Sequence, residues 1–379
     1  MARPFGVYVH FPYCTHRCPY CDFAVTTEPV PGERRYARAV LAELALRAPA
    51  FTGLSPASVY LGGGTPSLWD PDEVAEVLVA IRATFGVPQG AEVTIEVNPE
   101  SGDRGRLRAL REAGVNRVSV GAQSFDPGVL AKLGRRHGPE AAERAIRAAA
   151  DEVGNASVDL IYGARRSTVA IAQADARRAA AAGAVHVSAY QLTLDPDLLA
   201  EEVPLARMQK AGRLPLPSDD DAVRQGAAIR SALRRAGLRR YEISNYARAG
   251  FESVHNRLYW DGESYLGLGA GAYGCLRGEG GAVRYGNVRD AGAYVETALA
   301  GRLPTSEEDR ILARPERNER LMLALRTAWG VELGTLSPRQ AREAAEAVRR
   351  RLAVRRGGRL VLTSRGMDLH SALSERLFD

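Results

Sequence analysis

The stretch Cys14-Thr15-His16-Arg17-Cys18-Pro19-Tyr20-Cys21 places three of the four cysteines of the chain on one short segment. Thiolates are soft ligands that suit zinc or iron–sulfur clusters. A structural zinc site takes four ligands, usually as two separated pairs, whereas three cysteines can hold three irons of a [4Fe–4S] cluster. The fourth iron is then open to a substrate or cofactor. The spacing predicts a [4Fe–4S] cluster at Cys14, Cys18 and Cys21; the alternative is a zinc knuckle with His16 as the fourth ligand.

The residues on both sides extend this pattern. Tyr8–Cys14 reads YVHFPYC, and Asp22-Phe23 follows the third cysteine. The segment resembles the start of radical S-adenosylmethionine (SAM) proteins, and more narrowly the oxygen-independent coproporphyrinogen III oxidase-like group. In that family, SAM chelates the open iron and is cleaved to a 5′-deoxyadenosyl radical. The resemblance implies a [4Fe–4S] cluster and SAM as cofactors, with Tyr8 and Tyr20 at the SAM site.

The composition is that of an ordinary globular protein, with 379 residues, 45% hydrophobic and 25% charged. This length suggests two domains, or one large domain with an appendage. No apolar run approaches the ~20 residues that span a bilayer, so we expect a cytoplasmic protein without an integral membrane segment. The net charge is +6, and Ala/Arg-rich helices such as Ala141–Ala150 and Arg339–Arg351 carry the excess. Because this excess looks spread out, we expect no nucleic-acid partner.

Strand-like and helix-like segments alternate through the first half of the chain. The expected strands are Val7–His10, Ser58–Leu61, Glu92–Val97, Arg117–Val120, Ser157–Ile161 and Val185–Leu192. The expected helices are Glu33–Arg47, Asp70–Phe85, Arg104–Ala113, Glu140–Glu152 and Ser167–Ala182. Six repeats predict a parallel α/β architecture, without separating a doubly wound sheet from a barrel. The resemblance implies an open (βα)6 partial TIM barrel, the radical SAM core, with functional residues at the C-terminal ends of its strands.

The second half predicts a connecting region and a small C-terminal domain. Its expected elements are a helix over Asp219–Ala236, a strand-like run at Tyr241–Tyr246, helices near Glu307–Trp329 and Pro338–Leu352, a hairpin of Ala353–Arg355 with Arg359–Leu362, and a helix over Thr363–Phe378. This order indicates a winged-helix-like α+β fold. We expect the radical SAM barrel in residues 1–240, the connecting region in 241–303 and the C-terminal domain in 304–379.

Two strand ends after the cysteine stretch indicate a ligand site. Consecutive glycines at Gly62-Gly63-Gly64 let the backbone approach a ligand and expose its amides, although a tight turn is the alternative. Glu96 ends the next expected strand, where a carboxylate suits ribose hydroxyls and the alternative is an exposed acid. The resemblance implies that Gly63, Gly64 and Thr65 bind the SAM amino group and that Glu96 contacts SAM.

Three later residues also match family positions. The resemblance implies that Gln123, Arg135 and Asp159 contact SAM or substrate, and a guanidinium suits a carboxylate well. For Arg136 and His137 we expect a solvated loop. Two turns common in the family are absent: Ala164–Thr168 and Asp195–Leu199 stand in their places. These departures put a second SAM site in doubt.

The segment His255-Asn256-Arg257-Leu258-Tyr259-Trp260 reads HNxxYW. An imidazole can ligate haem iron, and aromatic rings can pack on a porphyrin face. The segment resembles the signature of the HemW family of haem chaperones, which implies haem binding at His255, Tyr259 and Trp260. The alternative is that His255 packs the bottom of the barrel. We interpret Cys275, in a run of small residues, as a buried core thiol.

Three features favour this haem-chaperone branch over the coproporphyrinogen III dehydrogenase. Asp22-Phe23 follows Cys21, where the dehydrogenase usually has a further cysteine two residues on; the chain begins a few residues before Tyr8; and HNxxYW is present. The resemblance therefore implies a chaperone that passes haem to acceptor proteins, such as respiratory enzymes, and lacks dehydrogenase activity. The alternatives are oxidative decarboxylation of coproporphyrinogen III, and radical methyl or cyclopropane transfer.

Overall fold

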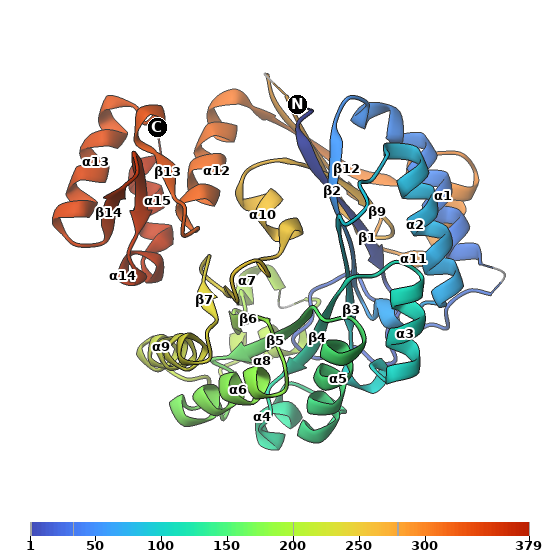
Figure 1. Cartoon of the computed structure of the whole chain (residues 1–379), viewed down its shortest axis with the longest axis horizontal. Coiled ribbons are helices and arrows are strands. Elements are labelled where there is room, and N and C mark those ends of the chain that lie inside the picture. Colours follow the sequence, from blue (N-terminus) through green and yellow to red (C-terminus); the bar gives the residue numbers. More distant parts are fainter. Residues whose placement is uncertain (1, 33, 200, 279, 379) are drawn as a thin grey trace.

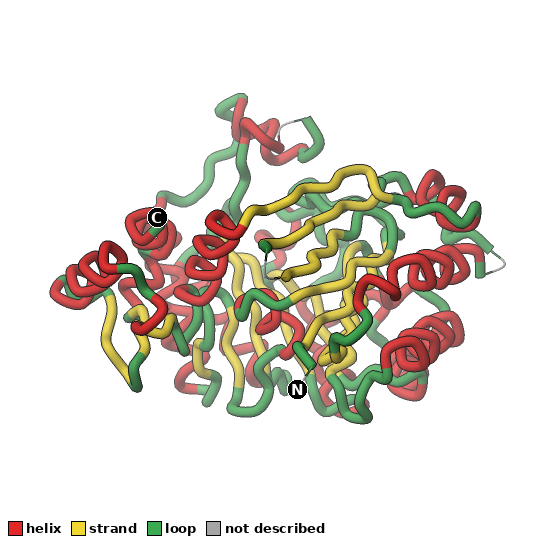
Figure 2. The backbone as a smooth tube through the Cα atoms, turned by 90° about the horizontal axis from the view of Figure 1, so that it is seen from above, coloured by secondary structure: helices red, strands yellow, loops and turns green. Residues whose placement is uncertain are grey.

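The computed structural model describes residues 2–32, 34–199, 201–278 and 280–378. Six parallel strands form the centre of one curved sheet, in the order of the chain. They are β1 (Pro4–Phe11), β2 (Ser55–Gly63), β3 (Glu92–Val97), β4 (Arg117–Gln123), β5 (Ala156–Tyr162) and β6 (His186–Gln191). Figure 1 shows helices outside this curve, and Figure 2 shows the sheet from above. The predicted open (βα)6 barrel is confirmed.

Most of the outer helices begin at a residue whose side chain caps the helix. They are α1 (Arg35–Arg47), α2 (Pro71–Phe85), α3 (Arg104–Glu112), α4 (Pro127–Lys132), α5 (Pro139–Glu152), α6 (Val169–Ala181) and α9 (Asp219–Arg235). Asp70 accepts the amide of Asp72 at the start of α2, and Thr168 accepts the amide of Ile171 at the start of α6. The apolar faces of the helices pack on the sheet in one large core, which leaves the inner side of the curve for polar side chains.

The connecting region extends the sheet on both sides of the barrel. It contains β7 (Arg239–Arg240), β8 (Asn245–Ala247), α10 (Val254–Trp260), β9 (Ser264–Leu268), β10 (Tyr273–Gly278), β11 (Gly281–Asn287) and α11 (Ala291–Leu299). β9 pairs in parallel with β1, and β8 pairs antiparallel with β6. Helix α10 lies inside the curve (Figure 1), where it contacts β1, β2 and β9.

The prediction of a helix near Glu307–Trp329 is wrong for the first part of this range. Thr305–Leu312 forms strand β12, which pairs antiparallel with β11, and the helix α12 covers only Ala313–Leu325. The acidic residues of this run favour a helix by propensity, but pairing with β11 overrides that preference. β12 thus belongs to the large sheet, although it lies beyond the expected boundary at residue 304.

The C-terminal domain has its own core and its own sheet, in the order β13-β15-β14. Its elements are β13 (Val331–Glu332), α13 (Pro338–Arg349), β14 (Ala353–Arg356), β15 (Arg359–Leu362), α14 (Ser364–Asp368) and α15 (His370–Leu377). The expected hairpin of Ala353–Arg355 with Arg359–Leu362 is confirmed, while the expected last helix is divided at Leu369.

The net charge is not spread along the chain as we expected. Residues 313–379 hold fourteen arginines and eight acidic residues, a net charge of +6, while residues 1–312 are neutral overall. The reason that we gave against a nucleic-acid partner therefore does not hold.

Two short helices, α7 (Pro196–Leu199) and α8 (Pro204–Lys210), follow β6 in the chain, and α8 contacts the cysteine segment. The amide of Leu205 donates to the carbonyl of Pro19 over 2.9 Å, and Tyr20 packs against the apolar cluster of α8.

Within the described ranges, no helix has both the length and the apolar character that a membrane span requires.

Candidate cluster and ligand site

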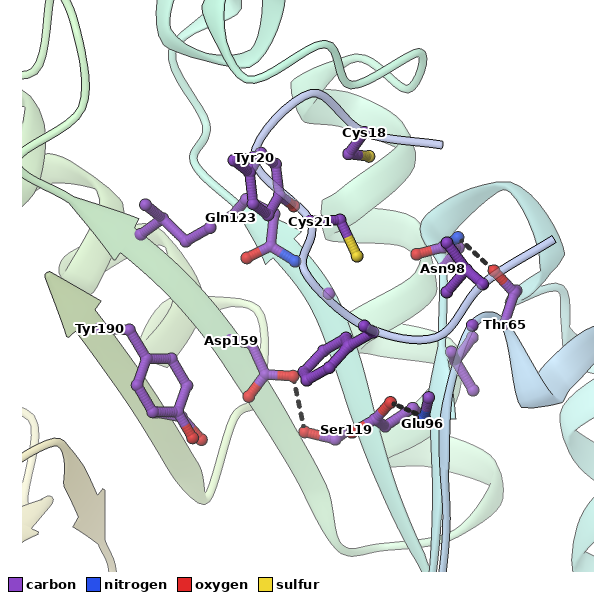
Figure 3. A pocket seen from close by; sticks show the side chains of 18 of the residues that line it. Cys18, Tyr20, Cys21, Thr65, Glu96, Asn98, Ser119, Gln123, Asp159 and Tyr190 are labelled. Carbon is purple, nitrogen blue, oxygen red and sulfur yellow. Dashed lines mark hydrogen bonds between the residues drawn. The ribbon is translucent and has the colours of Figure 1, made fainter. Parts of the chain in front are cut away.

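A cavity of about 400 Å³ lies inside the curve of the sheet, and its lining includes residues at the C-terminal ends of the strands (Figure 3). It brings together most of the residues predicted for the cluster and for SAM. These are Cys14, Cys18, Tyr20, Cys21, Gly63, Gly64, Thr65, Glu96, Gln123, Arg135 and Asp159. Tyr8 does not line it: its hydroxyl bonds to Nδ1 of His10 over 3.0 Å, and its ring packs beside Tyr60.

The cysteine segment is held as a loop between backbone hydrogen bonds. The amide of Cys14 donates to Thr26, and the amide of Thr26 donates to Pro12. Burial raises the pKa of Cys14, and it raises the pKa of Cys21 to about 11, so the free thiols are protonated at neutral pH. A bound metal centre would keep the thiols as thiolates.

The surroundings of the thiols fit an iron–sulfur cluster. The Thr65 hydroxyl donates to Cys14 Sγ over 3.4 Å, and Arg135 Nη1 donates to Cys18 Sγ over 3.5 Å. Among the described residues, no three His, Cys, Asp or Glu side chains converge on one metal ion. A cluster binds each thiolate at a different iron, so it does not need such convergence. His16 bonds instead to the carbonyl of Gly134 over 3.2 Å, with Cys18 Sγ at 3.6 Å.

The glycine run at the end of β2 serves close packing. Gly63 has a φ of +113°, and a Cβ there would lie 2.5 Å from the His10 ring. A Cβ on Gly64 would lie 2.8 Å from the backbone of Pro12. The expectation of exposed amides is wrong, because the amides of Gly63, Gly64 and Thr65 donate to Glu96, Phe11 and Tyr13. The glycines thus bring the cysteine loop against the strand end.

Two carboxylates face the cavity from neighbouring parts of the barrel (Figure 3). Glu96 accepts from the Tyr60 hydroxyl over 2.8 Å and from the Gly63 amide over 3.0 Å. Burial, and then the charge of Asp159, raises the pKa of Glu96 to about 7. Asp159 accepts from the Ser119 hydroxyl over 3.0 Å, and burial raises its pKa too. Glu96 is therefore not an exposed strand-end acid.

Gln123 and Arg135 both line the cavity. Gln123 has a φ of +62° where the β4–β5 register shifts, and such bulges redirect side chains. Arg135 Nη2 donates to Asn98 Oδ1 over 2.8 Å, while its buried Nε has no partner. Asn98 also donates to Thr65 over 2.9 Å, a role that sequence reasoning missed. The unpartnered Nε leaves one guanidinium donor for a ligand.

The loop that contains Arg136 and His137 is only partly solvated. Arg136 is exposed, as expected, but His137 is buried, and its Nε2 bonds to the carbonyl of Ala122 over 3.1 Å. The solvated-loop prediction for His137 is therefore wrong, because β4 covers this side chain.

Helix α10 closes the floor of the cavity. Glu92 at the start of β3 accepts the amides of Val254 and His255, each over 2.9 Å, and so caps the helix. His255 is buried, with Nδ1 bonded to the Ser58 hydroxyl over 2.8 Å and Nε2 to the Tyr259 hydroxyl over 2.9 Å. Burial lowers the pKa of His255 to about 3. Neither ring nitrogen is free, so this geometry matches packing at the barrel floor and not the expected haem ligation.

Asn256 and Trp260 of the HNxxYW segment have different surroundings. Asn256 lines the cavity, which sequence reasoning missed. Trp260 instead packs under the Arg326 guanidinium, 3.9 Å from its ring centre, and Arg326 bonds to the fully buried Glu242. The motif therefore joins the cavity floor to the C-terminal domain. Cys275 is fully buried, as predicted.

Comparison with known proteins agrees with this site. The radical SAM superfamily model matches residues 8–173. Coproporphyrinogen III oxidase (HemN) of Escherichia coli, a radical SAM enzyme, superposes with a TM-score of 0.78 over 99% of this chain and 90% of that chain, at 20% identity, which shows a shared fold. The loop of three cysteines on an open (βα)6 barrel thus defines a radical SAM protein.

Curated relatives identify one family within the radical SAM proteins. "Heme chaperone HemW" of Mycobacterium tuberculosis (strain ATCC 25618 / H37Rv) is 37% identical over 99% of this chain and 95% of the relative. Proteins of the same name from Bacillus subtilis (strain 168) and Escherichia coli (strain K12) are 32% and 35% identical over 86% and 72% of this chain, and over 84% and 70% of the relatives. The chain belongs to the HemW family of radical SAM proteins.

Proposed function

We propose that this protein is a haem chaperone: it holds a [4Fe–4S] cluster and SAM, binds haem and passes it to acceptor proteins. The observation that supports this most is the gathering of three thiols, Glu96 and Arg135 around one cavity. The names of its family relatives supply the haem part of the proposal.

Cys14, Cys18 and Cys21 would hold the cluster. A cluster bound in this way supplies one iron with an open position and an electron for reducing SAM. The buried Nε of Arg135 has no partner, and guanidinium groups bind carboxylates well, so it suits the SAM carboxylate. Glu96 suits the ribose hydroxyls as an acceptor. Since the cavity measures about 400 Å³, near the lower end of ligand-site volumes, we propose that one SAM binds.

The second candidate function is oxygen-independent coproporphyrinogen III dehydrogenase activity. The shared fold with coproporphyrinogen III oxidase favours it, but at 20% identity that likeness concerns the fold alone. We therefore prefer the chaperone function of the more similar family.

An anaerobic assay separates the two functions. The reconstituted protein, with SAM and reductant, is given coproporphyrinogen III in one sample and haem with an apo-acceptor in another. The chaperone proposal predicts haem transfer without formation of protoporphyrinogen IX. Formation of protoporphyrinogen IX without haem transfer would replace it with the enzyme function.

A further inference from the structure

Asn98 lies between two side chains that donate hydrogen bonds to the thiols, and Figure 3 shows its bond to Thr65. Asn98 Nδ2 donates to Thr65 Oγ1 over 2.9 Å, and Asn98 Oδ1 accepts from Arg135 Nη2 over 2.8 Å. Thr65 in turn donates to Cys14 Sγ over 3.4 Å. Arg135 Nη1 donates to Cys18 Sγ over 3.5 Å. One amide group therefore connects the contacts of two different thiols.

The direction of these hydrogen bonds follows from the groups that make them. A guanidinium has only donors, so the Asn98 atom that faces Arg135 is the carbonyl oxygen, and the amide nitrogen faces Thr65. A hydroxyl has one proton and can accept as well. Because the Thr65 oxygen accepts from Asn98, its proton is left for Cys14.

The Arg135 side chain is held in a similar way. Its Nη2 donates to Asn98 Oδ1 over 2.8 Å and to the carbonyl of Gly121 over 3.1 Å. Because the guanidinium is planar, these two bonds at Nη2 fix the direction of Nη1, which faces Cys18. Cys18 also lies 3.6 Å from the His16 ring, so the contact between Thr65 and Cys14 is the clearer one to test.

The backbone of Asn98 is held independently of its side chain. Asn98 follows β3, and its carbonyl accepts from the amide of Ser101 over 2.9 Å and from the Ser101 hydroxyl over 3.2 Å. These bonds involve the main chain of Asn98 and remain when the side chain is shortened. A change at this position should therefore disturb the hydrogen bonds near the thiols and leave the fold in place.

We propose that Asn98 is a positioning residue that sets the reduction potential of the cluster through Thr65 and Arg135. This rests on the cluster of the proposed function and deepens it. Hydrogen-bond donors to cluster-bound sulfur stabilise the reduced cluster, which carries more negative charge, and so raise the potential. Removal of the Asn98 side chain should lower the potential, because Thr65 and Arg135 lose the partner that directs them toward the thiols.

An anaerobic redox titration of the cluster without SAM, followed by electron paramagnetic resonance, tests this role. At the midpoint potential of the parent protein, Asn98→Ala should lower the ratio of reduced to oxidised cluster about tenfold, a shift of about 59 mV for one electron. A ratio that equals that of the parent would overturn the proposal.

Asn116→Ala is the matched control. The Asn116 side chain also accepts one hydrogen bond and donates another, each over 2.8 Å, but Asn116 does not line the cavity. Its loss should leave the ratio of reduced to oxidised cluster within about twofold of the parent, because it touches no cluster sulfur. Similar falls in Asn98→Ala and Asn116→Ala would overturn the proposal.

Two variants of Thr65 test how Asn98 acts. Thr65→Ser keeps the hydroxyl and should keep the parent potential, whereas Thr65→Val removes the donor to Cys14 and should lower it. In the Asn98→Ala background, Thr65→Val should lower the potential by less than it does in the parent, since both changes affect one contact. Fully additive shifts would overturn the action through Thr65.

Iron content separates this proposal from the proposed function, so each titration uses protein that holds about four irons per chain. A parent protein that forms no cluster contradicts the proposed function itself. A cluster whose potential is unaffected by Asn98→Ala and Thr65→Val contradicts this proposal alone. If Asn98→Ala loses its iron, equal potentials of Thr65→Ser and Thr65→Val would overturn the proposal.

Discussion

The backbone amide of Gly63 donates a hydrogen bond to Oε2 of Glu96 over 3.0 Å. This bond joins the end of β2 to the end of β3, and it fixes a buried carboxyl group beside the cavity. Burial and the neighbouring Asp159 raise the pKa of Glu96 to about 7. The group therefore changes its charge near neutral pH.

SAM affinity should increase as the pH rises through 7, because an ionised Glu96 accepts hydrogen bonds from hydroxyls more strongly. Glu96→Gln should bind SAM about tenfold more weakly above this pH and lose most of the pH dependence. Calorimetry at several pH values measures both effects. A parent protein whose SAM affinity ignores pH would contradict the assignment.

The stability of the ligand-free protein should change with pH in the opposite direction to SAM affinity: it should decrease as the pH rises. The pKa of Glu96 in the folded protein exceeds its ordinary value of 4.5. The protonated carboxyl group therefore contributes to the stability of the fold below pH 4.5, and this contribution is lost as the pH rises to about 7. Above this range, Glu96→Gln should therefore be more stable than the parent by on the order of 1–2 kcal/mol in urea unfolding. A less stable variant above pH 7 would argue against the raised pKa.

Anaerobically prepared protein should contain about four irons per chain. Replacement of Cys14, Cys18 or Cys21 by Ala should remove most of this iron. Cys275→Ala is the control: Cys275 is buried outside the cavity, so iron content should not change. Metal analysis and the visible absorption spectrum measure the result, and tightly bound zinc in place of iron would rule out the cluster.

His255→Ala should destabilise the protein by about 2–3 kcal/mol, since it breaks two buried hydrogen bonds and leaves a cavity. Tyr259→Phe, which removes one of these bonds, should cost about 1 kcal/mol. Both effects are read from urea unfolding. Haem bound to the folded His255→Ala variant should keep its Soret spectrum; a changed axial ligand would restore the histidine as a haem ligand.

Arg326→Met should destabilise the chain by about 3–5 kcal/mol, because it leaves the fully buried Glu242 carboxylate without its cation. Arg257→Met is the control. Arg257 stacks on Trp329 at 4.8 Å without an ion pair in the described contacts, so the loss should stay within about 1 kcal/mol. Similar losses in both variants would show that the Glu242–Arg326 pair does not hold the C-terminal domain.

The parts of the fold that depend on local pattern could be predicted from the sequence. β3 was expected at Glu92–Val97 and lies there, and the helix expected over Asp70–Phe85 is α2, which Asp70 caps. β12 was missed because its conformation depends on pairing with β11, which local propensity does not contain. The alternation of strands and helices indicated a parallel α/β architecture, whereas the choice of a barrel over a doubly wound sheet needed the family resemblance.

The site residues can likewise be divided into those that were predicted from the sequence and those that were not. Residues at strand ends, such as Glu96 and Asp159, were found through the family resemblance, and they lie together because the carboxyl ends of parallel strands meet. Contacts between distant segments were not: Asn98 reaches Arg135, and Ser58 bonds to His255, which lies 197 residues away. The environment of His255 decided its role, and no local signal carried that information.

The central claim is that this radical SAM protein binds and transfers haem without converting a porphyrin. Haem titration of the anaerobically reconstituted protein, followed by addition of an apo-acceptor, tests this most directly. The account predicts a saturable Soret change and haem that moves to the acceptor. The absence of saturable haem binding in protein that holds about four irons and binds SAM would contradict it.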